Sequence, residues 1–202
     1  MNRPGKIVGV GRNYVAHAKE LGNEVPSNPL LFLKPPTAVI ADGDTIILPP
    51  DSKQVEYEAE IGLLIGKRLR NVSEKEAIEG IAGITCVNDV TARDLQKADG
   101  QWTRAKSFDT FCPVGPRVVP LPVKFGDIEV MSRVNGKERQ HAKASDMVFN
   151  IPYLVAYISR IMTLEPGDLI ATGTPDGIGK LASGDTVEIE VSGVGILKNA
   201  VK

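Results

Sequence analysis

The clearest pattern of apolar and polar positions lies at residues 55–66, VEYEAEIGLLIG. It begins as strict alternation, which is typical of a strand with two different faces, and it ends as an apolar run. On such a strand Glu56, Glu58 and Glu60 point the same way. Carboxylates that a strand carries into a core are costly unless a cation, a proton or a donor compensates them. The stretch alone leaves two interpretations open, a metal site or an exposed edge with solvated glutamates.

Elsewhere the pattern predicts short strands and few helices. Strands are expected at 6–10, 30–33, 45–48, 84–87 and 169–172, hairpins at 125–139 and 185–201, and helices at 14–21, 73–81 and 151–161. Asn13 is the candidate N-cap of the first helix, and Ser73 with Glu76 matches a capping box. Asn135-Gly136 is a type I′ turn signal. Residues 101–116 are expected to be loop-like, with a strand end.

Composition narrows the function classes. The chain has 202 residues, long enough for one domain over 1–202, and 20 Gly and 14 Pro indicate many turns. Its 24 basic and 25 acidic residues leave a net charge of −1, so no nucleic-acid or membrane partner is expected. No apolar run approaches 18 residues, and the two cysteines form no CxxC, which suits a cytoplasmic protein with reduced thiols.

Polar residues on two predicted helical segments could carry chemistry. His17 and Glu20 are three residues apart on the first helix and share a face, although a solvated surface explains them equally well. If residues 91–96 are helical, Asp89, Arg93 and Gln96 line one face. Asp89 could instead be an N-cap.

Two lysines and one loop are further candidates. Lys106 lies between small and apolar residues, where a lysine is either desolvated and paired or extends its amine to solvent. Lys34, at the end of an apolar strand, either binds an anion or reaches solvent in the same way. The loop 173–179, GTPDGIG, offers successive amides and the Thr174 hydroxyl as a carboxylate cradle. It lacks the P-loop lysine, so nucleotide binding is not expected.

Six segments occur in an order that resembles the fumarylacetoacetate hydrolase superfamily, and most of all its short, single-domain acylpyruvase-type members. They are GRNYVAHAKELG, LFLKPP, YEAEIGLLIGK, NDVTARDLQ, QWTRAKSFDTFCPVGP and GDLIATGTPDGIG. The resemblance spans nearly the whole chain. It implies a β-rich α+β fold, the mixed-strand β-roll of the superfamily's C-terminal domain with a few short helices, and it implies a homodimer.

The resemblance also assigns roles to residues. In this superfamily an E-x-E strand and a following aspartate hold Mg²⁺ or Mn²⁺, which implies the metal ligands Glu58, Glu60 and Asp89. Glu56 shares their face but lies outside the pattern. The remaining implied residues are catalytic His17, Glu20 and Lys106 and substrate-binding Arg93, Gln96 and Thr174.

These parts suit a 2-oxo acid substrate, whose carboxylate and keto oxygens can fill open positions on the cation. The main expectation is hydrolysis of a C–C bond in an acylpyruvate-like 2,4-dioxo acid, such as acylpyruvate or fumarylpyruvate, through a metal-stabilised enolate. His17, held by Glu20, would activate water, and Lys106 with Gln96 would hold the oxyanion or the substrate carboxylate. Arg93 and Thr174 would position the substrate, and the helix carrying His17 would act as a lid. Lid residues Val15, Lys19 and Asn23 are candidates for reading the acyl group.

Because several reactions share the enolate, other activities stay open. The alternatives are oxaloacetate decarboxylation or tautomerisation, and the isomerisation of 2-hydroxyhepta-2,4-diene-1,7-dioate with decarboxylation of 5-oxopent-3-ene-1,2,5-tricarboxylate. A binding module without turnover is a different class. A metal-dependent nuclease would need a basic groove, which the near-neutral charge does not supply.

Overall fold

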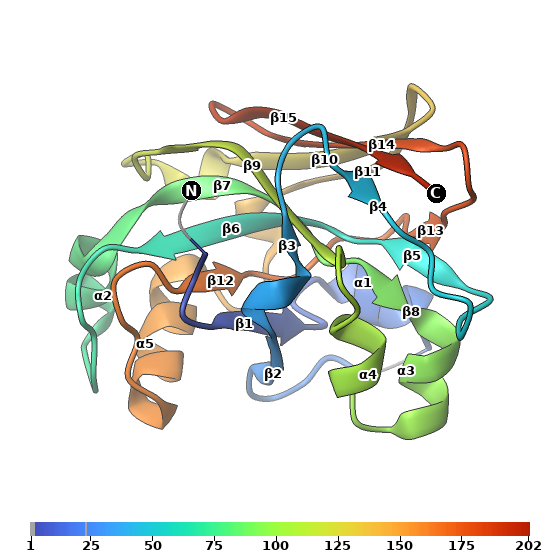
Figure 1. The fold of residues 1–202 in the computed structure, drawn as a ribbon. Coiled ribbons are helices and arrows are strands. Elements are labelled where there is room, and N and C mark those ends of the chain that lie inside the picture. The colour runs from blue at the N-terminus through green and yellow to red at the C-terminus, as the bar shows by residue number, and fades with distance from the viewer. Residues whose placement is uncertain (1–2, 23) are drawn as a thin grey trace.

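The computed structural model describes residues 3–22 and 24–202 as two stacked sheets with a third small sheet at one end (Figure 1). In spatial order the largest sheet contains β2 (Leu30–Lys34), β1 (Ile7–Gly11), β12 (Leu169–Ala171), β6 (Ala59–Ile65), β7 (Ile81–Asn88), β9 (Cys112–Val119) and β3 (Val39–Ile40). The sheet is mixed, because β12 runs parallel to β1 and antiparallel to β6.

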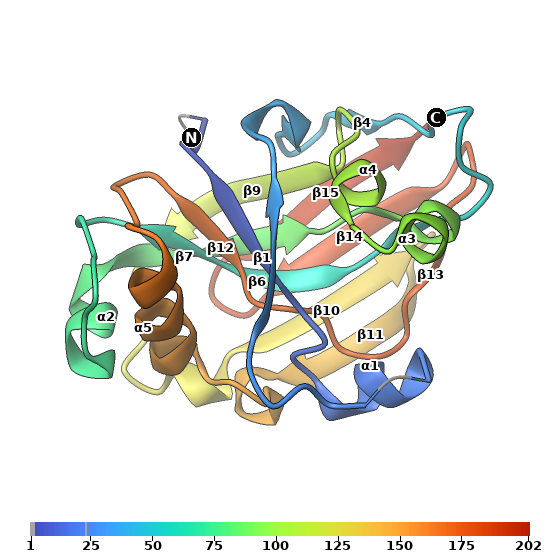
Figure 2. The same cartoon turned by 90° about the horizontal axis from the view of Figure 1, so that it is seen from below.

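The second sheet covers one face of the first, as the view from below also shows (Figure 2). It contains β11 (Lys137–Lys143), β10 (Glu129–Val134), β14 (Thr186–Val191), β15 (Gly195–Val201) and β4 (Thr45–Ile46). The third sheet contains β13 (Gly179–Lys180), β5 (Val55–Tyr57) and β8 (Thr91–Ala92). Strand β6 contacts β10 and β14 of the second sheet, so it is buried almost throughout. Burial on both faces explains its continuous apolar run.

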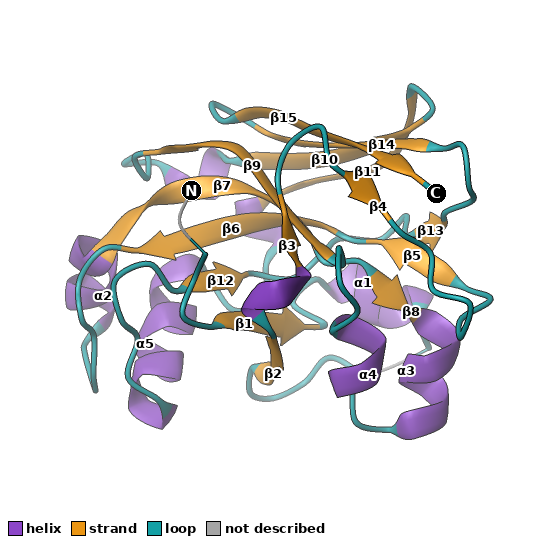
Figure 3. Cartoon of the chain, in the orientation of Figure 1, coloured by secondary structure: helices purple, strands orange, loops and turns teal. Residues whose placement is uncertain are grey.

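The α-helices gather at the two ends of the stacked sheets (Figure 3). They are α1 (Val15–Glu20), α2 (Glu74–Gly80), α3 (Arg93–Asp99), α4 (Thr103–Lys106) and α5 (Ile151–Ile161), with 3₁₀ turns η1 (Pro36–Ala38), η2 (Phe125–Asp127) and η3 (Ala144–Asp146). Helices α2 and α5 pack together at one end, and α1, α3 and α4 lie at the other. Among the described residues, no helix is both long and apolar enough to cross a membrane.

Most predicted elements are confirmed, including the β-rich fold class. Ser73 and Glu76 form the capping box at the start of α2, because the backbone N–H of each is bound by the side chain of the other. Asn135 and Gly136 both have positive φ, 52° and 75°, in the turn between β10 and β11. A type I′ turn requires this conformation, and asparagine and glycine adopt it most easily.

The single strand predicted at 55–66 is wrong, because the chain divides it at Glu58. Strands β5 and β6 belong to different sheets. The Glu58 N–H donates to Asn88 Oδ1 at 3.0 Å, and the Asp89 N–H donates to the Glu58 carbonyl at 2.9 Å. An asparagine side chain thus takes the place of a backbone partner, and it redirects the chain at this point.

Three smaller expectations are also wrong. Tyr14, not Asn13, is the N-cap of α1, because the Asn13 side chain binds the backbone of Phe149 and Thr172 instead. Residues 101–116 do end in a strand, the start of β9, but the part expected to be loop-like also contains α4. The strand expected at 45–48 is only the two-residue β4, and Pro49 follows soon after.

Candidate active site

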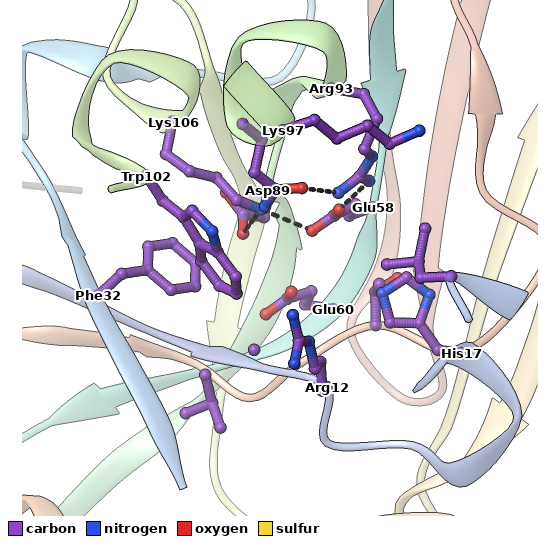
Figure 4. A pocket seen from close by; sticks show the side chains of 15 residues that line it. Arg12, His17, Phe32, Glu58, Glu60, Asp89, Arg93, Lys97, Trp102 and Lys106 are labelled. Atoms are coloured by element: carbon purple, nitrogen blue, oxygen red, sulfur yellow. Dashed lines mark hydrogen bonds and ion pairs between the residues drawn. The ribbon is translucent and has the colours of Figure 1, made fainter. Parts of the chain in front are cut away.

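A cavity of about 210 Å³ opens where β1, β2, β6 and β7 meet helices α1, α3 and α4 (Figure 4). Fifteen residues line it: Val10, Gly11, Arg12, His17, Leu21, Phe32, Glu58, Glu60, Asp89, Arg93, Gln96, Lys97, Trp102, Lys106 and Thr174. All nine residues singled out from the sequence except Glu20 are among them. The lid residues Val15 and Lys19, expected to read the acyl group, are exposed outside the cavity lining, and Asn23 is outside the described residues.

Three carboxylates converge in this cavity. One oxygen from each of Glu58, Glu60 and Asp89 lies within 4.8 Å of the others, and all three residues are buried. The sheet register brings them together, since Ala59 pairs with Asn88 between β6 and β7. Glu58 and Asp89 are therefore neighbours at the adjacent strand ends. The solvated-edge interpretation of the glutamates is wrong.

Three buried cations compensate two of these carboxylates. Lys106 Nζ lies 2.8 Å from Glu58 Oε2 and 2.6 Å from Asp89 Oδ2. Lys34 Nζ lies 2.5 Å from Asp89 Oδ1, and Arg93 Nη2 binds Glu58 Oε1. Neither lysine extends to solvent. Asp89 precedes α3, whose N-cap is Ala92, so the N-cap interpretation of Asp89 is also wrong.

The third carboxylate is different. The Glu60 Oε2 atom accepts one hydrogen bond, from the Gly173 N–H at 2.8 Å, and the carboxylate has no cationic partner within salt-bridge distance among the described residues. Burial, reinforced by Asp89 and Glu58, raises the pKa of Glu60 well above its ordinary value. Burial also opposes ionisation of Glu58, but Lys106 and Arg93 outweigh it and hold that pKa below the usual range.

A buried carboxylate that no cation of the described residues pairs with, beside two carboxylates held in ion pairs, is a good match to a divalent cation. The donor set is all oxygen, which hard cations such as Mg²⁺ and Mn²⁺ prefer. Glu58, Glu60 and Asp89 would hold the ion. Both lysines bind the Asp89 carboxylate, and Lys106 also binds Glu58. The lysines would therefore hold these metal ligands in position.

Helix α1 brings His17 to the opposite side of the cavity. His17 Nδ1 lies 3.3 Å from Glu20 Oε2, so the predicted H-x-x-E pair is in contact. The other oxygen of Glu20 accepts the Gly177 N–H at 3.0 Å. Glu20 thus joins the His17 helix to the loop that follows β12.

That loop differs from the predicted substrate cradle. Its amides at Gly173 and Gly177 bind the protein's own Glu60 and Glu20. Thr174 donates its hydroxyl proton to the Ala59 carbonyl at 2.9 Å and accepts from Gln140 Nε2 at 2.8 Å. The Thr174 hydroxyl and two amides of the loop are therefore already bound within the protein.

Arg93 also has more partners than the sequence indicated. Its Nε lies 2.8 Å from Glu56 Oε2, and its Nη1 lies 2.6 Å from Gln96 Oε1. Glu56 accepts a further bond from the Gln54 side chain at 2.6 Å. The glutamate outside the family pattern thus positions the arginine that binds Glu58.

Sequence reasoning missed the cavity wall. Arg12, Phe32 and Trp102 line it, and the two rings meet edge to face with centroids 5.4 Å apart. It also missed Gln140, a buried residue on β11 that binds the Thr174 loop. No local pattern marks these residues, because their positions depend on which strands become neighbours.

Known proteins resemble the chain over its whole length. The family model described as "Fumarylacetoacetate (FAA) hydrolase C-terminal" matches residues 6–202. The mitochondrial oxaloacetate tautomerase of Arabidopsis thaliana is 44% identical over 194 residues, which cover 94% of this chain and 87% of the relative. The mitochondrial oxaloacetate decarboxylase of Dictyostelium discoideum is 42% identical over 195 residues, 94% of this chain and 89% of the relative.

A solved structure is also similar to the chain in fold and in sequence. The 2-hydroxyhepta-2,4-diene-1,7-dioate isomerase from Mycobacterium marinum has a TM-score of 0.91 and 46% sequence identity, over 98% of this chain and 75% of that one. Both the family model and the identities extend across every segment that builds the cavity. The chain therefore belongs to the fumarylacetoacetate hydrolase family.

Proposed function

We propose that this protein is a divalent-metal-dependent enzyme that decarboxylates or tautomerises a small 2-oxo acid of the oxaloacetate type. The observation that carries the proposal is the buried cluster of Glu58, Glu60 and Asp89 on the wall of the cavity, in which Glu60 forms no ion pair with the described residues. The relatives described above are named as a tautomerase, a decarboxylase and an isomerase. Those names support the alternative reactions better than the expected acylpyruvate hydrolysis.

The size of the cavity favours a small substrate. Its volume of about 210 Å³ is below the roughly 300–1,000 Å³ typical of sites for drug-sized ligands. A four-carbon acid suits this space better than a seven-carbon dienedioate.

The chemistry follows from the residues around the cluster. Mg²⁺ or Mn²⁺ bound there would polarise the keto group of the substrate and stabilise the negative charge of an enolate. Lys106 and Arg93 keep Glu58 ionised and fixed in position. In decarboxylation the bond between C3 and the distal carboxylate breaks, CO₂ leaves, and the enolate takes a proton at C3. In tautomerisation the proton moves between C3 and the keto oxygen.

We assign the transfer of that proton to His17, which lines the same cavity. Glu20 binds its Nδ1, and its Nε2 has no hydrogen-bond partner in the described part of the chain. An imidazole held in this way can take or return a proton at Nε2.

Hydrolysis is the second candidate, and the contact between His17 and Glu20 favours it. A histidine held by a carboxylate can activate a water molecule, which contributes about 10²–10⁴-fold to the rate. Acylpyruvate cleavage needs this water, whereas decarboxylation does not.

Product analysis by NMR separates decarboxylation or tautomerisation from hydrolysis. The protein is incubated with oxaloacetate or acetylpyruvate, with Mg²⁺, with Mn²⁺ or with EDTA. We expect metal-dependent formation of pyruvate or of the enol from oxaloacetate, faster than any cleavage of acetylpyruvate. Faster acetylpyruvate cleavage, lost in His17→Ala, would make hydrolysis the main activity. Tight binding without turnover of either acid would identify a binding module and refute the proposal.

A further inference from the structure

Arg12 differs from every other buried or half-buried cation of the cavity. Arg93, Lys106 and Lys34 are each bound to carboxylates. Arg12 lines the same cavity and is half-buried, yet it makes no ion pair or hydrogen bond with any residue of 3–22 or 24–202. Figure 4 shows it beyond Glu60, on the side of the cavity away from Lys106. A half-buried guanidinium without a partner is costly unless a ligand supplies one.

The backbone holds Arg12 in an uncommon conformation. Its φ is +57°, the left-handed region that residues other than glycine seldom adopt. The residues on either side of it are closely held. A Cβ atom at Gly11 would lie 2.7 Å from the Trp102 ring, and the Asn13 side chain is tied to Phe149 and Thr172. Such strain clusters where it has a use, and here the conformation accompanies a side chain that borders the cavity.

The charge of the site also leaves a role for Arg12. Four buried carboxylates, Glu56, Glu58, Glu60 and Asp89, face three buried cations, Lys34, Arg93 and Lys106. With all four carboxylates ionised, one negative charge is left over, and a divalent ion would turn this into one positive charge. That balance suits an acid with a single carboxylate. With Arg12 the site carries two positive charges, which match a dianion.

We propose that Arg12 binds the distal carboxylate of a 2-oxo dicarboxylate, and that the cavity therefore selects dicarboxylic over monocarboxylic 2-oxo acids. The proposal rests on the proposed function, which places the 2-oxo head of the substrate at the carboxylate cluster. A guanidinium can bind a carboxylate through two parallel hydrogen bonds. Lys97 also lines the cavity without an ion-pair partner among the described residues, but it is exposed, so water already solvates its charge.

Trp102 provides a direct measurement of binding. It is the single tryptophan of the chain and lines the cavity, so its fluorescence reports occupancy without turnover. With Mg²⁺ present, three inert ligands are titrated. Oxalate mimics the head alone, (S)-malate adds a distal carboxylate, and (S)-2-hydroxybutyrate has a methyl group in its place.

We expect wild type to prefer malate to 2-hydroxybutyrate. In Arg12→Gln the malate affinity should fall about 10–100-fold, because a hydrogen-bonded charge pair is lost, while oxalate affinity stays within about twofold. Arg12→Lys should recover part of the malate affinity. Arg70→Gln, which removes an exposed arginine that does not line the cavity, should change the affinity for neither malate nor oxalate.

Two results would overturn the proposal. If malate binding is unchanged in Arg12→Gln, the distal carboxylate lies elsewhere. If malate and oxalate weaken in parallel, Arg12 serves the carboxylate cluster instead. A wild type that binds neither oxalate nor malate with Mg²⁺ or Mn²⁺ is a distinct result, because it refutes the proposed function itself and the inference with it.

Discussion

The two sides of the cavity are built in different ways. On the sheet side, Glu58 and Asp89 lie at strand ends that backbone pairing fixes, 2.8 Å and 2.6 Å from Lys106 Nζ, which comes from the end of α4. All three side chains are at most 5% exposed. On the helix side, His17 and Glu20 lie on the six-residue α1, with one contact of 3.3 Å, and the Glu20 side chain is 32% exposed. Solvent screening weakens the second contact but not the first.

This contrast suggests that the two sides of the cavity have different roles. Breaking a buried ion pair leaves a charge without compensation, so the sheet side cannot open without large cost. The polar contacts on the helix side are weaker, because opening would break only the long Glu20–His17 contact and the Glu20–Gly177 bond, besides exposing His17 and Ala18. We therefore expect a rigid ligand cluster faced by a lid that opens to admit substrate.

The largest expected effect is on the sheet side. Lys106→Met keeps the length of the side chain but leaves buried Glu58 and Asp89 each short of one cation. We expect the free energy of unfolding to fall by about 3–5 kcal/mol, the usual cost of removing one partner from a buried ion pair. Urea unfolding of the metal-free protein measures the change.

Lys97→Met is the matched control for that variant. Lys97 is an exposed lysine of the same cavity with no ion-pair partner in the described part of the chain. Its replacement should alter the free energy of unfolding by no more than about 0.5 kcal/mol. A loss below about 1 kcal/mol in Lys106→Met would show that the sheet side tolerates an unpaired charge, and the contrast between the two sides would fail.

Glu60→Gln should separate metal binding from stability. Removing one partner of a buried charge contact costs about 2–5 kcal/mol, so the affinity for Mn²⁺ should fall about 100-fold or more. Calorimetric titration with Mn²⁺ measures it. In the absence of metal the variant should be at least as stable as wild type, since Glu60 is buried beside Asp89 and Glu58 and forms no ion pair with the described residues. Unchanged Mn²⁺ affinity would remove Glu60 from the ligand set.

The pH dependence of that stability difference has a definite sign. Burial, with Asp89 and Glu58, raises the pKa of Glu60 in the folded protein, so the folded state keeps this proton after the unfolded state has lost it. Stability therefore falls as pH rises from the unfolded pKa through the folded one. Metal-free Glu60→Gln should match wild type in acid and exceed it as pH rises. Parallel stability curves for the two proteins would contradict this.

The sequence predicted the sheet side well, because local patterns encode it. Alternation placed Glu58 and Glu60 on one face, and Asp89 follows an apolar strand. The strands and turns were also readable, down to the capping box of Ser73 and the Asn135-Gly136 turn. Family resemblance then selected the metal interpretation over the solvated edge.

The side-chain contacts between distant segments around the cavity could not be predicted in the same way. Lys34 reaches Asp89 across 55 residues of sequence, and Gln140 reaches Thr174 across 34. Such contacts depend on which strands become neighbours, and no local periodicity records that. Arg12 stayed hidden for a different reason, since its positive φ is a property of the folded turn and arginine does not signal it.

The smallest expected effect is on the helix side. Glu20→Gln keeps an oxygen that can accept from the Gly177 N–H but removes the charge that faces His17. We expect kcat for oxaloacetate to fall only about tenfold, because the contact is long and partly exposed to solvent. The free energy of unfolding should stay within about 0.5 kcal/mol of wild type. Steady-state kinetics and urea unfolding give the two values.

Hydrogen exchange sharpens this last prediction, because it reports opening of the helix directly. If Glu20 holds α1 closed only through weak contacts, amides of Val15–Glu20 should exchange faster in Glu20→Gln, while those of β6 and β7 keep their wild-type protection. Glu79→Gln is the matched control, because Glu79 is an exposed glutamate on α2. It should change neither the exchange rate of the α1 amides nor kcat. A loss of stability in Glu20→Gln as large as that in Lys106→Met would make α1 part of the rigid side, and substrate would then need another way into the cavity.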